Sequence, residues 1–94
     1  MAEPADIRLV QLARLLRLSR TSPRDVILAA VRQQPQTLAA AFFAEAADND
    51  DVISAETARG YLADRLAFFA GLIDAATAAD IERRFAHHLK AWES

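Results

Sequence analysis

The stretch PQTLAAAFFAEAADNDDVISAETARGYLADRLAFFAGLI, residues 35–73, carries the start and stop signals of two successive helices. Pro35 suits a first helical turn because it lacks the amide hydrogen that would be unpaired there. The apolar run behind it is rich in alanine, the best helix former, and ends at the acidic loop DNDD, residues 48–51. These signals predict a helix over residues 35–47.

The second half of this stretch predicts a longer helix after Ser54, whose side chain can cap the first helical turn. Leu62 and Phe69 belong to an apolar stripe that recurs at helical spacing. Gly71 lies where a helix end favours a residue with left-handed backbone geometry. The helix is therefore expected over residues 55–70.

Two further helices are expected towards the N-terminus. The first covers residues 4–18, in which leucines share one face and arginines lie largely elsewhere. The motif SPRD marks the start of the next helix, with Ser22 as the cap, Pro23 at the first helical position and Asp25 bonding back to the cap. Pro35 ends this second helix because it disfavours helical geometry at the preceding residue.

A fifth helix is expected to start at Asp74 or Thr77. The segment IDAATA repeats the pattern of ISAETA, so that Asp74 and Ser54 both stand at cap positions. The apolar stripe of this helix consists of Ile81, Phe85, Leu89 and Trp92. No segment alternates apolar and polar residues long enough to predict a strand. The sequence predicts an all-α fold, a compact bundle of about five short helices in a single domain, residues 1–94.

The composition excludes several classes of protein. The 94-residue chain has no cysteine, which rules out disulfide scaffolds, thiolate metal sites and cysteine nucleophiles. The start MAEPAD is acidic, unlike the basic first region of a signal peptide. No apolar stretch approaches the roughly 18 residues that a membrane-spanning helix needs. We expect a cytoplasmic protein, of a kind plausible in bacterial or phage regulation, with no membrane partner.

The charges are distributed unevenly along the chain. Residues 1–34 hold six arginines against three acids, or +3, whereas residues 35–94 hold five bases against ten acids, or −5. The sum is the overall net charge of −2. Domains that bind nucleic acid are usually clearly basic, so this balance makes DNA the less favoured partner.

Motifs for catalysis or metal binding are absent from the sequence. An EF-hand loop starting at Asp48 would need glycine at its sixth place and an acid at its twelfth, but Ile53 and Arg59 stand there. His87 and His88 point about 100° apart on a helix, and no cysteine or third histidine could complete a metal shell. Phosphate-binding loops and hydrolase motifs are missing. We expect no enzymatic activity, no cofactor and no metal.

Residues 26–73 resemble the three-helix core of a helix-turn-helix or winged-helix protein, with the sequence ISAETARGYL at the start of the DNA-reading helix. The first, second and reading helices would be residues 23–33, 36–47 and 55–70. The resemblance implies a DNA-binding transcriptional regulator that contacts DNA through Arg59 and Arg65. Against it, the connection 48–53 is longer than the usual three to four residues, and its aspartates would repel phosphates.

The favoured interpretation is a non-enzymatic protein that binds another protein or a second copy of itself, as a regulator, inhibitor or adaptor. A strip of small side chains on the fourth expected helix would let another helix approach closely, and Gly60 costs about 1 kcal/mol of helix propensity relative to alanine. The helix that fills this space belongs either to the same chain or to a partner. The candidate partner-binding residues are Arg59, Gly60, Ala63, Ala67, Leu15, Leu18 and Trp92.

Overall fold

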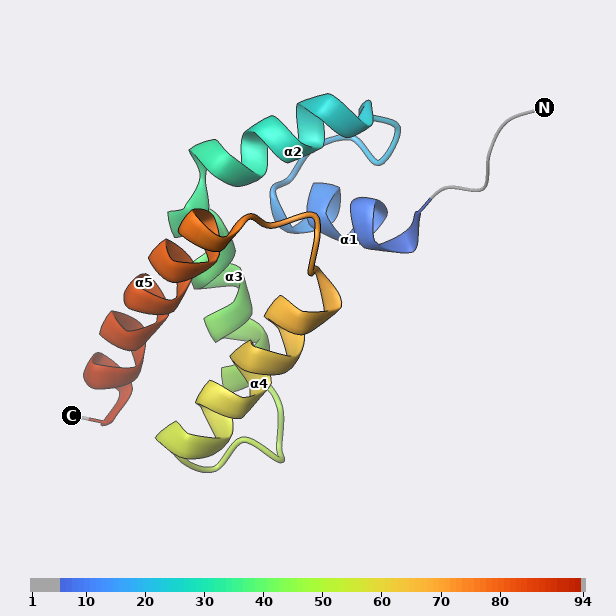
Figure 1. Cartoon of the computed structure of the whole chain (residues 1–94). Coiled ribbons are helices and arrows are strands. Elements are labelled where there is room, and N and C mark those ends of the chain that lie inside the picture. Colours follow the sequence, from blue (N-terminus) through green and yellow to red (C-terminus); the bar gives the residue numbers. More distant parts are fainter. Residues whose placement is uncertain (1–5, 94) are drawn as a thin grey trace.

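The computed structural model describes residues 6–93 and contains, within that range, five α-helices and no strand (Figure 1). The helices are α1 (Ile7–Leu15), α2 (Arg24–Gln33), α3 (Pro35–Ala47), α4 (Ala55–Phe68) and α5 (Ala75–Glu93). The expected all-α bundle is confirmed.

The central helix is α3, which packs against the other four helices and most extensively against α5. Its residues Leu38 and Phe42 are fully buried, and the Phe42 ring stacks on Phe69 with the ring centroids 6.0 Å apart. On the side of α5, Phe43 meets Phe85 edge to face at 5.6 Å. α3 can fill this position because its sequence is apolar around most of the helix.

The starts of α4 and α5 follow the sequence signals. The Ser54 hydroxyl accepts the backbone N–H of Thr57 at 3.3 Å, and the Thr57 hydroxyl oxygen accepts the N–H of Ser54 at 3.0 Å, which completes a capping box. At the start of α5, the Asp74 carboxylate accepts the N–H of Thr77 at 2.7 Å. Gly71, between the two helices, has φ +87° as expected. The starts of α4 and α5 are therefore confirmed, whereas α4 ends at Phe68, two residues before its expected end.

The end of α1 differs from the expectation, because the helix stops at Leu15 rather than at Leu18. The Leu18 N–H folds back to the carbonyl of Ala13 at 2.7 Å, and the Arg17 N–H reaches the carbonyl of Arg14 at 3.1 Å. This pair of bonds is a Schellman motif, in which the residue after the cap adopts left-handed geometry. Arg17 takes that conformation with φ +59°, although the position favours glycine.

The cap predicted for α2 is wrong. Pro23, not Ser22, occupies the cap position, with the extended geometry φ −60° and ψ 152°, and its carbonyl accepts the N–H of Ile27 at 3.1 Å. No side chain caps this helix. Because the helix starts one residue later than expected, Ser22 lies outside capping reach and Asp25 acts only through its favourable charge in the first turn.

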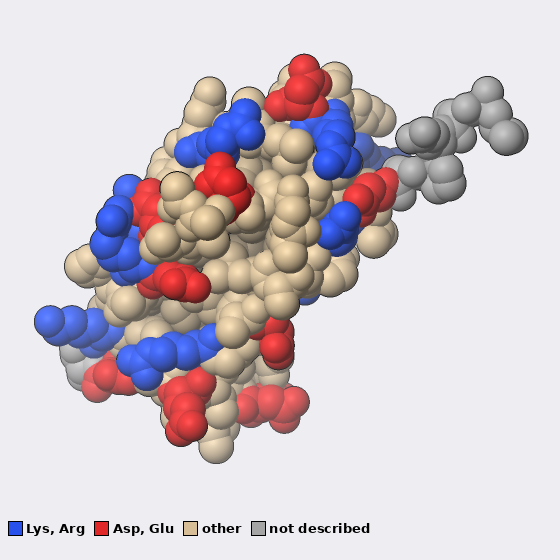
Figure 2. All heavy atoms as spheres, viewed as in Figure 1, with Lys and Arg blue, Asp and Glu red and all other residues tan. Residues whose placement is uncertain are grey.

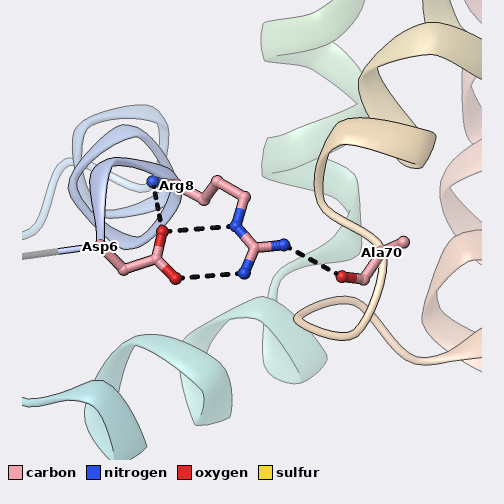
Figure 3. A network of polar contacts seen from close by, with 3 residues as sticks. All are labelled: Asp6, Arg8 and Ala70. Atoms are coloured by element: carbon pink, nitrogen blue, oxygen red, sulfur yellow. Dashed lines mark hydrogen bonds and ion pairs between the residues drawn. The ribbon is translucent and has the colours of Figure 1, made fainter.

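The N-terminal end of α1 is tied to the connection between α4 and α5 (Figure 3). Asp6 caps the helix by accepting the N–H of Arg8 at 2.9 Å, and its two carboxylate oxygens also accept from the Arg8 guanidinium at 3.3 and 3.1 Å. These bonds lower the pKa of Asp6 below its ordinary value. The same guanidinium donates to the carbonyl of Ala70 at 3.2 Å. The expected start of the helix at Pro4 lies outside the described residues.

Candidate protein-binding surface

An open groove runs between α4 and α5, with a volume of about 220 Å³. Three apolar residues form its floor: Leu62 of α4 with Phe85 and Leu89 of α5, each almost fully buried. Its walls are Arg59 and Ala63 of α4 and Glu82 and Ala86 of α5. We call this feature the α4–α5 groove. Because the floor residues are buried, the accessible surface of the groove comes mainly from the small and charged residues of its walls.

The outer face of α4 beside this groove is not covered by any described part of the chain. Gly60, Ala63 and Ala67 are all exposed. A Cβ atom built on Gly60 would meet no heavy atom within 4 Å other than the helix's own backbone. Of the two occupants left open by the sequence, a helix of the same chain is therefore excluded among residues 6–93.

Charges of both signs border the groove. Arg59 and Glu82, both exposed, stand on opposite walls. Over α4 and α5, Figure 2 shows basic and acidic side chains interspersed with uncharged surface. The rim therefore gives no strong preference for an acidic or a basic partner.

Arg65, the second arginine proposed to contact DNA, is instead engaged inside the bundle. Its guanidinium donates to the side-chain oxygen of Gln11 at 3.0 Å, and its Nε lies 4.0 Å from Glu45. Its carbon centre sits 5.1 Å from the ring centroids of both Phe68 and Phe69. This side chain connects α4 to α1 and α3. Of the proposed DNA-contacting pair, Arg59 is the exposed member.

Glu45 also accepts a hydrogen bond of 2.9 Å from the hydroxyl of Tyr61. Burial, followed by this bond to a carboxylate, raises the pKa of the Tyr61 phenol above its ordinary value. Tyr61, Glu45 and Arg65 thus form a polar cluster that fixes the rotation of α4 about its axis. The outer face of α4 is then presented to solvent.

Two further features weigh against DNA as the partner of α4. Glu56 and Asp64 are exposed on the same helix as Arg59, and the loop before α4 is acidic. In addition, α2 packs mainly on α1 and α3, whereas α4 packs on α3 and α5. The helix-turn-helix interpretation receives less support from this arrangement than from the sequence pattern.

The other candidate residues lie apart from the groove. Leu15 and Leu18 are partly buried against the core, and Leu15 lines a separate hollow between α1 and α3. Trp92 is 42% exposed and meets the Phe43 ring edge to face at 6.3 Å. The structure therefore brings together Arg59, Gly60, Ala63 and Ala67, and places the remaining three elsewhere.

Sequence reasoning did not identify the α5 wall of the groove. Phe85 and Leu89 belong to the predicted apolar stripe, but the sequence does not reveal that they form the floor of a groove beside α4. Glu82 and Ala86 carry no signal of their own, because a glutamate and an alanine are ordinary on an exposed helix face. Only the position of α4 makes these four residues of α5 one side of the groove.

Metal and membrane sites receive no support within the described range. His88 stacks on Phe43 with centroids 5.2 Å apart, so its ring belongs to the aromatic contact between α3 and α5. No group of three or more potential metal-ligating side chains is present among residues 6–93. None of the helices described there has the length and apolar character needed to cross a bilayer.

Comparisons of the chain with protein-family models, with curated proteins and with solved structures give no match.

Proposed function

We propose that this chain acts without catalysis, by binding a helix of another protein chain in the α4–α5 groove. The observation that supports this most directly is the groove itself, in which exposed small residues of α4 and α5 lie beside the buried apolar side chains of Leu62, Phe85 and Leu89. A helix that enters a groove of this kind removes apolar surface from water, which is the main driving force of association.

The small side chains set the distance at which such a helix can lie. Packed helices are separated by 8–10 Å, depending on the side chains at the contact. With Ala63 and Ala86 exposed in the walls and Gly60 exposed on the neighbouring face of α4, a partner helix can approach at the short end of this range. Arg59 then offers one positive charge and Glu82 one negative charge for ion pairs with the partner.

A second copy of the chain is one partner that meets these requirements. In a two-fold symmetric dimer, both copies use the same surface, so a contact between one residue and another occurs twice, once in each direction. Arg59 of one copy could therefore pair with Glu82 of the other, while the small residues of both α4 helices face each other. A different protein with a helix of mixed charge fits equally well, so the solution mass decides between them.

The test uses one substitution at the groove and the same substitution away from it. Ala63→Glu places a carboxylate over the apolar floor, whereas Ala76→Glu changes an exposed alanine in the first turn of α5 that does not line the groove. Analytical ultracentrifugation gives the mass of the purified chain, and affinity capture from native lysate followed by mass spectrometry gives its partners.

We expect the native chain to be dimeric or to retain a specific protein. Ala63→Glu should release that partner with unchanged helical content by circular dichroism, and Ala76→Glu should retain it. A native chain that is monomeric and captures no protein contradicts the proposal, as does equal binding by both variants. Binding to duplex DNA that falls steeply with salt and is lost in Arg59→Ala would favour the DNA-binding alternative instead.

A further inference from the structure

A second groove lies between α1 and α3 and shares no lining residue with the α4–α5 groove. It consists of two adjoining hollows of about 430 and 500 Å³ that have Leu15, Ala41 and Ala44 in common. We call it the α1–α3 groove. Its floor is formed by Ala40, Ala41 and Ala44 of α3, and Leu15 of α1 forms one wall.

The floor of this groove is the uncharged outer face of the central helix. Ala40 and Ala44 are exposed, although α3 contacts every other helix of the bundle. An alanine face exposes little side-chain volume, so a second helix can lie close to the α3 backbone along this side. The groove spans α3 from Gln36 to Glu45, a rise of about 14 Å at 1.5 Å per residue, or two to three helical turns.

The rim of the groove carries positive charge. Arg14 and Arg17 are both exposed, and within residues 6–93 neither has an ion-pair partner. The acid that lines the groove, Glu45, is already engaged with the Tyr61 hydroxyl and faces Arg65. The charged side chains that remain available to a ligand at this rim are therefore basic.

Arg17 is the residue that ends α1. Its φ of +59° completes the Schellman motif at that end, where glycine would be accommodated without strain. Its side chain lines the α1–α3 groove beside Leu15. The end of α1 therefore places a basic side chain on the groove.

We propose that the α1–α3 groove binds an acidic amphipathic helix of a partner protein. Small or apolar residues of that helix lie on the alanine floor against Leu15, and its carboxylates pair with Arg14 and Arg17, since arginine forms two parallel hydrogen bonds with a carboxylate. A membrane is less suited, because the floor has no large apolar side chain to insert. Nucleic acid is less suited, because Glu45 lies on the groove and two free arginines make a small phosphate-binding surface.

The test uses a fluorescein-labelled helical peptide of about 18 residues, or five turns, with alanine and leucine on one face and glutamate on the other. A matched peptide carries glutamine in place of glutamate. Fluorescence anisotropy measures binding to the full chain, and amide shifts in ¹⁵N-labelled protein locate it. We expect salt-sensitive binding of the glutamate peptide, with shifts at Ala40, Ala41 and Ala44, and much weaker binding of the glutamine peptide.

Three variants separate charge from shape. Arg14→Glu with Arg17→Glu should weaken binding by about tenfold or more, because carboxylates would then oppose carboxylates. Arg20→Glu with Arg24→Glu changes the net charge equally at exposed positions outside both grooves and should leave binding within about twofold. Ala44→Lys adds a positive charge but fills the floor, so it should also abolish binding.

Several results would overturn the proposal. One is that the native chain does not bind the glutamate peptide. The others are an equal loss of peptide binding in both double variants and tighter peptide binding by Ala44→Lys. Stronger binding to duplex DNA or to phosphatidylserine vesicles, lost in the same Arg14 and Arg17 variant, would assign the groove to another ligand class. Ala63→Glu should retain peptide binding, so failure at one groove is distinguished from failure at the other.

Discussion

The two grooves of this molecule are both lined by alanines, but they differ in floor and in charge. The α4–α5 groove opens onto the buried side chains of Leu62, Phe85 and Leu89, and its rim carries one arginine and one glutamate. The α1–α3 groove has only alanine and Leu15 beneath it, with two exposed arginines at its rim that form no ion pair within residues 6–93. The first depends on apolar burial and the second on charge, so salt should weaken partner binding mainly at the second.

The two grooves depend on the same central helix, α3. One side of α3 packs against the helices that form the α4–α5 groove, and its other side is the floor of the α1–α3 groove. Changes at the core of α3 should therefore affect both grooves together, whereas changes at helix ends should affect one of them.

The largest effect is expected for Phe42→Ala. Phe42 is fully buried and stacks on Phe69, and truncation of such a ring costs about 3–5 kcal/mol of the free energy of unfolding. Chemical denaturation followed by circular dichroism measures this loss. Phe68→Ala, at a ring that is 38% exposed, is the control and should cost about 1 kcal/mol. If hydrogen exchange in Phe42→Ala rises at only one groove, α3 does not support both grooves together.

Next in size is Ser54→Ala, which acts on the α4–α5 groove alone. Loss of the capping box at the start of α4 should cost about 1 kcal/mol of stability and raise hydrogen exchange in the first turn of α4. Ser22→Ala is the matched control, because Ser22 precedes α2 without capping it, and should change stability by less than about 0.5 kcal/mol. An equal loss in the two variants would contradict the assigned caps.

Arg17→Gly is expected to change stability in the opposite direction. Glycine adopts the left-handed geometry of this position without the cost of about 1 kcal/mol that a side chain incurs, so the thermal midpoint should rise. Gly71→Ala, at φ +87°, should lower stability by a similar amount. If Arg17→Gly also reduces binding of the acidic peptide, the arginine at this position lowers the stability of the fold but contributes to binding at the α1–α3 groove. A lower midpoint for Arg17→Gly would contradict the strain at this position.

The smallest effect separates the caps of α1 and α5 by pH. The pKa of Asp6 is lowered by hydrogen bonds from Arg8, and that of Asp74 by the backbone N–H of Thr77, both from the ordinary value of 3.8. A carboxyl whose pKa is lower in the folded state stabilises the fold above the unfolded value, and this stabilisation is lost as pH falls through the folded value. The urea concentration at the unfolding midpoint should therefore decrease as the pH falls below about 4.

One substitution tests how much of this acid response comes from the cap of α5. Asp74→Asn keeps a capping side chain but cannot titrate, so it should flatten part of the response while retaining most of the stability at pH 7. Asp64→Asn, on the exposed face of α4, is the control for a lost surface charge. If the urea midpoint of Asp74→Asn follows pH as that of the native chain does, the cap does not contribute to the acid response.

The success of sequence reasoning depended on how local each signal is. Ser54, Asp74 and Gly71 act within one turn of their own position, and all three were predicted correctly. Ser22 failed as a cap because Pro23 moved the helix start by one residue, and the early end of α1 depends on left-handed geometry at an arginine, which propensity disfavours. The exposed candidates on α4 were grouped correctly on one face by periodicity, but their partner wall on α5 was not.

The sequence by itself determined the number of helices, most of their ends and most of the apolar positions from which the core is built, because capping, proline and apolar periodicity act within a few residues of one another. Only the tertiary structure decided which small-residue faces are covered and which remain open. Periodicity gives the angle of a residue about its own helix axis, but not the position of the next helix. Ala63 and Ala44 therefore look alike in the sequence, and the placement of α5 and α1 makes one a wall of an apolar groove and the other the floor of a basic one.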